Sequence, residues 1–554
     1  MRLLGVVLCV LGVVASASTR AQEHPASNDP SEPIIMDPTA KRSDVDIVRQ
    51  AEGDTPRVKL SLHEAIEEGL RKGLRLETER YGPYIANEDL ASAWGAYDPE
   101  LFANYQYSSI SSPQATQLLN QAFVNQNIAA GDAGLRGILP FIGTGYQVNY
   151  SIDRTVTNSS LSTLSPNVNS FLGATVTQPL LRNLIWNQPW TRVKVLQVGS
   201  SAASDEFLRQ LMDTVQSIEN AYWQLIARSE TLRVADKSLE TAKVLLDQTQ
   251  TQYEVGVVSK VEVTEAEAGV ATRDFDVITS KNLYLRSQDQ LIDLVYGEEL
   301  RPVLKFVVDP TDNPEDTTRY DVNLDLAVEK AYRFRPELAL AKNEVQRREY
   351  EMQYAKSQRL PLLDAVGTYG YQGLTGSVNR SCVNFRGPGP CTSAFDDRNV
   401  LAANDVWGGR RGLQWTAQGI FSIPIGNNER SHAYDKAQLE YRRANTLIKR
   451  TEQDIILDVR NAVRNLESAY EGIESAERSR IAAAEQLRAE RIRLEHGEST
   501  PFDVLLRERE LVNQEQRKIA ALQIYRDSAT ALDRAQGTIL QSHNIVVEEV
   551  SALR

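Results

Sequence analysis

Apolar residues recur at every seventh position in the stretch from Trp190 to Tyr253, and Gly256 marks the end of this stretch. A seven-residue apolar repeat without an interrupting proline indicates a coiled-coil helix. About 64 residues at about 1.5 Å per residue predict a rod nearly 100 Å long. The apolar stripe consists of Leu211, Ile218, Leu225, Leu232, Leu239, Leu246 and Tyr253.

The same pattern occurs a second time, 241 positions later. Tyr253-Glu-Val-Gly256 then overlies Leu494-Glu-His-Gly497, and only Arg480 interrupts the second stripe. An internal repeat dictates the architecture of a chain, so each half is predicted to have a long helix, a tight turn and a shorter returning helix. The second stripe consists of Val459, Leu466, Ile473, Leu487 and Leu494.

A shorter helix is predicted at the start of each half, from Leu60 and from Val322. Ser61 with Glu64 three residues later has the spacing of a capping box at the first of these helices. Matched prolines then separate helix from extended chain, because proline ends a helix. These candidate strand–helix junctions are Pro99, Pro179, Pro361 and Pro424.

Between these prolines the apolar period changes from 3.6 to 2. In the tract from Leu413 to Phe421, for example, apolar residues alternate with polar ones, with Ile420 as the exception. Such tracts suit strands that face lipid on one side and a wet lumen on the other. A half-buried soluble sheet gives the same alternation. The tract from Tyr146 to Asp153 needs an antiparallel companion, for which the weak 134–139 tract is the candidate, so the chain has either four strands plus an outer loop or six.

The N-terminus has the pattern of a cleavable signal peptide, with Arg2, the apolar run Leu3–Val14 and the small residues Ala15-Ser16-Ala17. The alternative is a membrane anchor, but the run is too short to span a bilayer. The predicted segments are a signal peptide at 1–17, a flexible leader at 18–58, a first helix–strand–strand–helix repeat at 59–297, a linker at 298–321, a second repeat at 322–537 and a C-terminal tail at 538–554.

Composition narrows the class of protein. A mean hydropathy of −0.37 excludes a bundle of membrane-spanning helices. The net charge of −13 over 554 residues argues against nucleic-acid binding. There is no Gly-rich phosphate loop before a helix, no nucleophile elbow and no cluster of metal ligands, so we expect no enzyme activity, no cofactor and no metal.

Two cysteines, Cys382 and Cys391, bracket a turn-rich Gly-Pro stretch. In an exported protein this spacing favours a local disulfide. Two free thiols in a loop are the alternative.

The duplicated order of helices and strands resembles the TolC family of outer-membrane efflux ducts. The resemblance also rests on Arg335-Pro-Glu-Leu338, on Leu360-Pro-Leu-Leu363 and on the paired turns Tyr253-x-x-Gly256 and Gly497-Glu-Ser-Thr-Pro-Phe-Asp503. It implies a mixed all-α plus membrane β-barrel fold, in which long antiparallel coiled-coil helices continue a barrel. It further implies a homotrimer with four strands per chain, in outer-membrane lipid, with the helices in the periplasm of a Gram-negative-type cell. The implied partners are a periplasmic adaptor protein and an inner-membrane pump.

At the helical tips, the resemblance implies that Glu262 and Asp503 line the closed entrance of the duct. Both acids also sit three residues after a Ser or Thr, which is the spacing of a capping box, and the two roles are compatible. The turns are candidates for adaptor contact, although a hairpin needs glycine there in any case. The candidate contact residues are Gly256, Val257, Val258, Ser259, Lys260, Gly497, Glu498, Ser499 and Thr500.

We therefore predict an exit duct of a tripartite efflux or type I secretion system. The alternative is an exported coiled-coil scaffold that spans the envelope without a pore. That alternative explains the seven-residue stripes but leaves the alternating strands without a role.

Overall fold

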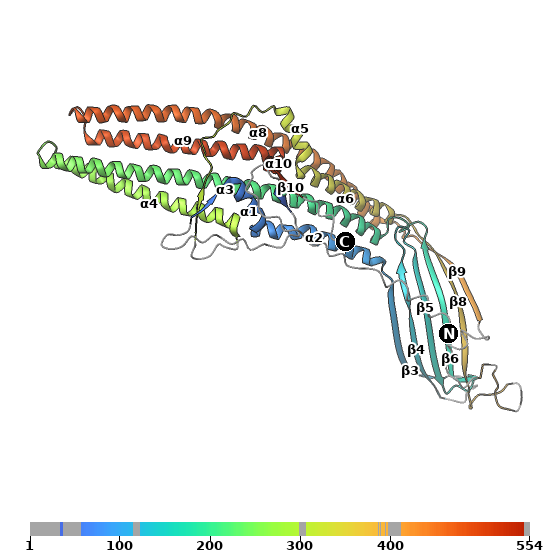
Figure 1. The fold of residues 1–554 in the computed structure, drawn as a ribbon. Coiled ribbons are helices and arrows are strands. Elements are labelled where there is room, and N and C mark those ends of the chain that lie inside the picture. The colour runs from blue at the N-terminus through green and yellow to red at the C-terminus, as the bar shows by residue number, and fades with distance from the viewer. Residues whose placement is uncertain are drawn as a thin grey trace.

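The computed structural model describes residues 34–36, 57–114, 122–297, 306–396 without 386, 388 and 394, and 412–547. The predicted signal peptide lies outside these residues. The described part is elongated, with long helices at one end and a single large sheet at the other (Figure 1). The fold is therefore mixed helix and sheet, as the change of period predicts.

In the first half, helices lead into strands and strands lead back into helices. The elements are α1 (Leu62–Lys72), α2 (Leu74–Trp94), the 3-10 turn η1 (Gly95–Tyr97), β3 (Glu100–Pro113), β4 (Phe123–Ile138), β5 (Gly145–Thr157), β6 (Leu164–Pro179), α3 (Gln188–Glu254) and α4 (Lys260–Tyr296). The capping box at Ser61 is confirmed, because its hydroxyl accepts from the Glu64 backbone N–H and the Glu64 carboxylate accepts from the Ser61 N–H at 2.8 Å.

The second half has the same order of element types with fewer strands. Its elements are α5 (Leu324–Phe334), α6 (Pro336–Gln358), β8 (Leu362–Val378), β9 (Gly412–Ser422), α8 (Asn428–Glu495), α9 (Pro501–Gln536) and the short α10 (Ile539–Ser542).

All six long strands belong to one antiparallel sheet in the order β3-β4-β5-β6-β8-β9. The sheet of the described chain thus has two strands more than the four per chain that the resemblance implies. The alternative with six strands is the one observed. The companion of β5 is β4, which spans Phe123–Ile138 and is much longer than the weak 134–139 tract suggests.

The long helices form two antiparallel hairpins that lie side by side, α3 with α4 and α8 with α9 (Figure 1). Helix α3 has 67 residues and α8 has 68, close to the predicted rod. The buried apolar residues of α3 pack with α1 and α4, and those of α8 pack with α5 and α9. A small third cluster near the tips joins the hairpins through Leu245, Leu487, Val504 and Leu505.

Two short parallel ladders lie beside the middle of the helices. Strand β1 (Ile34–Met36) pairs with β10 (Ile545–Val547), and β2 (Arg57–Leu60) pairs with β7 (Val307–Pro310). The buried Tyr222 of α3 holds the second ladder in place, because its hydroxyl donates to the Leu60 carbonyl at 3.0 Å. Parts of the predicted flexible leader, linker and tail are therefore ordered strand.

Within the described ranges, no helix has a stretch that is long and apolar enough to cross a bilayer.

Candidate functional site

The sheet has one apolar and one polar face along its whole width. Residues directly opposite in an antiparallel pair share a face, so the registers define rows that cross all six strands. One row reads Leu101, Leu135, Val148, Ala174, Tyr369 and Trp415. The neighbouring row on the other face reads Glu100, Arg136, Gln147, Thr175, Thr368 and Thr416.

Side chains of the polar face bind one another across the strands. Arg136 and Glu100 form an ion pair at 2.8 Å, and the Asn104 amide donates to Asp132 at 3.1 Å. The Asn169 amide donates to Asp153 at 3.0 Å. Large side chains of the apolar face are instead widely exposed, with Leu101 at 81 % and Trp415 at 68 %. An apolar surface of this extent needs a non-aqueous or protein neighbour.

The four candidate junction prolines lie at the ends of strands. Pro99 directly precedes β3 and Pro179 is the last residue of β6. Pro361 directly precedes β8, and Pro424 follows β9 by two residues. These places agree with the physical reason for their prediction, since proline lacks the N–H that would continue a helix or a central ladder.

An aromatic cluster that the sequence reading missed lies where α2 and α3 meet the sheet. The ring centroids of Phe141 and Trp190 are 4.7 Å apart, and those of Trp94 and Trp190 are 6.1 Å apart. Phe141 lies in the short turn between β4 and β5. Because the sequence did not predict the full length of β4, it did not place Phe141 beside Trp190. Aromatic residues with a polar edge are typical of a membrane–water interface.

At the helical tips, both turns have the same backbone. Gly256 has φ +80° and Gly497 has φ +74°, a conformation that glycine adopts without a steric penalty. The next residue then donates its N–H back to the helix, from Val257 to the Gln252 carbonyl and from Glu498 to the Arg493 carbonyl, each at 2.8 Å. These are Schellman turns, which explains why the two glycines share one position in the two halves.

Glu262 and Asp503 cap the helices that return from these turns. The Glu262 carboxylate accepts from the Ser259 N–H at 2.7 Å. The Asp503 carboxylate accepts from the Thr500 hydroxyl at 2.7 Å, and this hydrogen bond lowers the pKa of Asp503. Each acid directly follows an exposed apolar residue, which is Val261 at 66 % before Glu262 and Phe502 at 52 % before Asp503.

A charged side chain buried beside the second tip was also missed. Glu490 accepts from the Ser499 hydroxyl at 2.6 Å and pairs with Arg493 and Arg507 at 3.4 and 3.7 Å, although only 8 % of it is exposed. This group of charges fixes the turn to both α8 and α9. Glu490 could have been found in the sequence, because it follows Leu487 by three residues. At this spacing a coiled-coil stripe predicts an apolar residue, not an acid.

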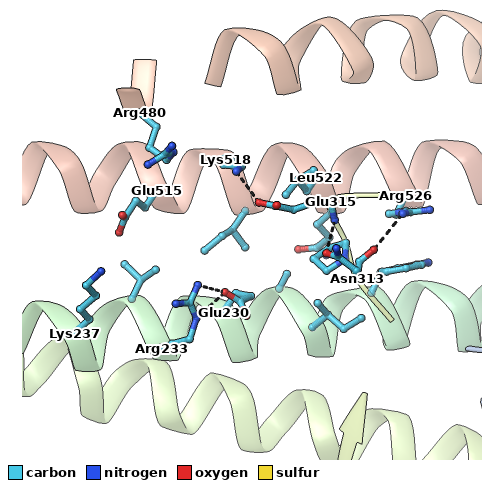
Figure 2. Close-up of a pocket in the computed structure, with 17 residues that line it drawn as sticks. Glu230, Arg233, Lys237, Asn313, Glu315, Arg480, Glu515, Lys518, Leu522 and Arg526 are labelled. Carbon is cyan, nitrogen blue, oxygen red and sulfur yellow. Dashed lines mark hydrogen bonds and ion pairs between the residues drawn. The ribbon is translucent and has the colours of Figure 1, made fainter. Parts of the chain in front are cut away.

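A pocket of about 380 Å³ lies between α3 and α9, beside the 313–315 segment (Figure 2). Arg480, the residue that interrupts the second apolar stripe, lines it and pairs with Glu477 at 2.7 Å. Lys518 bridges Glu315 at 2.7 Å and Glu477 at 3.2 Å. These ion pairs link α8, α9 and the 313–315 segment beside the pocket, so the charges that line this side of it are paired within the protein.

The Arg335-Pro-Glu-Leu338 block belongs to an ion network between four helices. Glu337 binds Arg335 at 3.3 Å and Arg534 at 2.7 Å, and Arg534 also binds Asp213 at 2.7 Å. Arg335 reaches Asp458 at 3.1 Å. Burial favours the neutral acid, but the two arginines outweigh it and lower the pKa of Glu337 to about 2.

At the opposite end of the molecule, Cys382 and Cys391 are joined by a disulfide in the loop after β8. The loop lies on the turn between β5 and β6, because the Asn379 amide donates to the Ser159 and Ser162 carbonyls at 2.9 and 3.0 Å. In the described part of the chain no group of acidic, histidine or cysteine side chains has the arrangement of a metal site.

The described chain therefore combines one large two-faced antiparallel sheet with two long paired helical hairpins. The sequence matches the outer membrane efflux protein family over residues 143–295 and 327–538, which is more than half of the chain. The protein therefore belongs to the outer membrane efflux protein family, whose members are transport channels and not enzymes. No protein of curated function matches it by sequence.

Solved structures of similar fold are bacterial outer-membrane proteins. The CmeC outer membrane channel of Campylobacter jejuni has a TM-score of 0.61 and 13 % identity, over 88 % of this chain and 90 % of CmeC. The outer membrane protein VceC of Vibrio cholerae has a TM-score of 0.60 and 15 % identity, over 86 % and 96 %. The MtrE outer membrane channel of Neisseria gonorrhoeae, in its open state, has a TM-score of 0.58 and 16 % identity, over 86 % and 89 %. At this identity the likeness concerns the fold.

Proposed function

We propose that this protein is the outer-membrane exit duct of a tripartite efflux or type I secretion system. Three copies form a barrel in the outer membrane and a helical tunnel across the periplasm. The observation that carries the proposal is the two-faced sheet, with its apolar rows toward lipid and its polar rows toward a wet lumen. The scaffold alternative gives this sheet no role.

Several copies are needed because one sheet does not close on itself. Six strands are fewer than the roughly eight of the smallest outer-membrane barrels. The helices support the same assembly, since α4 exposes Phe275 at 68 % and Ile278 at 60 % in a single copy. In a tunnel of packed hairpins such side chains contact the neighbouring copy.

At the periplasmic mouth we assign two functions to the tips. Glu262 and Asp503 contribute six carboxylates per trimer, which favour cations at a narrow entrance. Their capping role fits this assignment, because a carboxylate that caps the returning helix lies at the turn of the hairpin. The exposed turn residues around Val257 and Glu498 are the docking surface for a periplasmic adaptor that connects the duct to an inner-membrane pump.

Single-channel recording in planar lipid bilayers tests the proposal. Detergent-extracted protein should give discrete, cation-selective conductance steps. A folded oligomer that never conducts would overturn the duct and favour the scaffold. Circular dichroism and light scattering on the same preparation verify that the sample is folded and oligomeric.

A further inference from the structure

The hairpin β3–β4 adds two strands to the four that the family resemblance implies. It is an integral part of the sheet, since each residue from Gln126 to Ile138 of β4 faces a residue of β5. Strand β3 in turn pairs with β4 along its full length, from Glu100 to Pro113. The matched family range begins at residue 143, so the hairpin lies before it.

This hairpin has the same two faces as the rest of the sheet. Its apolar row contributes Leu101 and Leu135 to the row that ends at Trp415. Its polar row contributes the Glu100–Arg136 ion pair to the row that ends at Thr416. A plug or surface loop has no reason to keep this alternation in register over six strands, whereas a wall between lipid and water requires it.

The two outer strands of the sheet, β3 and β9, each have one edge without a backbone partner among the described residues. All eleven residues of β9 are exposed, and so are most of β3. Long, apolar, unpaired edges attract another strand. Because the six strands alternate in direction, β3 and β9 run antiparallel to each other, and the edge of one copy fits the opposite edge of the next.

We propose that β3 of each copy pairs with β9 of the neighbouring copy, so that three copies close a barrel of eighteen strands. This inference rests on the proposed trimeric duct and goes beyond it. A barrel grows in width roughly in proportion to its strand number, so eighteen strands give about 1.5 times the width of twelve. The outer-membrane segment then does not limit the size of what passes through the duct. The narrowest point lies in the helical part instead.

The competing arrangement is a twelve-stranded barrel in which β9 pairs with β5 of the next copy. Strand β5 has no free edge for this, because β4 and β6 occupy both of its edges. The arrangement requires that the whole β4–β5 ladder open in each copy. The two arrangements therefore differ in which strand lies beside β9.

Disulfide cross-linking between copies decides between them. Thr416→Cys on the polar face of β9 is combined in turn with a cysteine on the polar face of β3 or of β5. Several positions are used on each strand because the register between copies is not fixed by one chain. The β3 series is Asn104→Cys, Gln106→Cys and Ser108→Cys, and the β5 series is Gln147→Cys, Asn149→Cys and Ser151→Cys.

After mild oxidation in the membrane, at least one member of the β3 series should give covalent dimers and trimers on a non-reducing gel. The β5 series should give none. Cross-linking through β5 but not β3 would overturn the proposal, as would an oligomer that conducts in bilayers but shows neither product. Absence of any oligomer would instead count against the proposed trimeric duct itself.

A deletion variant provides a matched second test. Removal of residues 101–142 joins η1 directly to β5, which runs in the same direction as β3. In this variant β5 becomes the edge strand, so the β5 series should now cross-link to Thr416→Cys. If the β5 series cross-links to Thr416→Cys equally well in the full-length protein and in the deletion variant, the hairpin is not part of the barrel wall. The substitution series in the full-length protein decides the question even where the shortened protein does not fold.

Discussion

At the scale of single residues, the tip acids combine a local role with the proposed role in the duct. We expect Asp503→Asn to lower the cation selectivity of the channel, because it removes three of the six proposed carboxylates while it keeps an oxygen that can accept from Thr500. The measurement is the reversal potential in bilayers under a salt gradient.

Thr500→Ala is the matched variant for the cap. It removes the hydroxyl that accepts from the Asp503 N–H at 3.3 Å but leaves the Asp503 charge. We expect a loss of stability of about 1 kcal/mol with unchanged selectivity. If Asp503→Asn leaves the reversal potential at its original value, Asp503 is a cap without a role in the lumen.

A second residue-scale prediction concerns acid stability through Glu337. Its pKa is lowered from 4.5 to about 2 in the folded protein, so its contribution to stability is present above pH 4.5 and is lost as the pH falls toward 2. The shift corresponds to about 3 kcal/mol. Melting temperatures between pH 2 and pH 7 should therefore show a steeper acid loss in the native protein than in Glu337→Gln.

Asp458→Asn is the control for this network. Asp458 binds the same Arg335 but its side chain is 56 % exposed, and exposed ion pairs contribute only about 0–1 kcal/mol. We therefore expect the melting temperature of this variant to depend on pH almost as it does in the native protein. If the melting temperature falls with pH equally in the native protein and in Glu337→Gln, the network contributes little to acid stability.

At the scale of elements, the seven-residue stripe predicted the long helices better than it predicted which residues they bury. Leu211, Ile218 and Leu225 are fully buried, but near the tip the buried position shifts to Leu245, and Tyr253 is 44 % exposed. Leu245 packs against Leu487, Val504 and Leu505 of the second hairpin. The earlier stripe residues pack with α1 and α4, so the buried side of α3 changes with its partner along the 67 residues of the helix.

The sequence left four and six strands open for a different physical reason. On its apolar face, β4 presents Ala129, Gly131 and Ala133, which are too small to give a clear alternation in the sequence. The register with β3 and β5 supplies the missing information, and it is set by contacts between strands. The charged residues Arg480 and Glu490 were visible in the sequence as breaks in the apolar pattern, but their partners come from other elements.

Leu225 provides an element-scale prediction. It is fully buried in the core that α3 forms with α1 and α4. We expect Leu225→Ala to destabilise the protein by about 2–5 kcal/mol, because it removes buried methyl groups and leaves a cavity. Thermal unfolding monitored by circular dichroism measures this loss.

Glu240→Ala on the exposed face of the same helix is the control, with an expected change within about 0.5 kcal/mol. A charged residue at position 225 should prevent stable assembly altogether. Equal melting temperatures for Leu225→Ala and Glu240→Ala would show that the stripe is not a packed seam.

At the scale of the whole molecule, the helical tips and the far end of the large sheet lie at opposite ends of an elongated structure (Figure 1). Helix α3 alone spans about 100 Å, and the 16 residues of β6 add about 50 Å. The turn between β5 and β6, with the disulfide loop on it, is at one end. The two Schellman turns are at the other.

The proposed orientation therefore places these ends in different compartments. Leu161, in the turn between β5 and β6, is 50 % exposed, and Leu161→Cys should react with a membrane-impermeant maleimide on intact cells. Glu498→Cys at the tip should react only after the outer membrane is permeabilised. Cys382 and Cys391 do not compete for the reagent because they are joined in a disulfide.

Protein without either substitution controls for background labelling, and permeabilised cells show that both cysteines are reactive. Labelling of Glu498→Cys on intact cells would place the helical tips outside the cell and contradict the proposed duct. The assay is independent of oligomer formation and of conductance. It therefore tests whether the polar and apolar faces of the sheet belong to an outer-membrane wall, because only that arrangement separates the two ends by a lipid barrier.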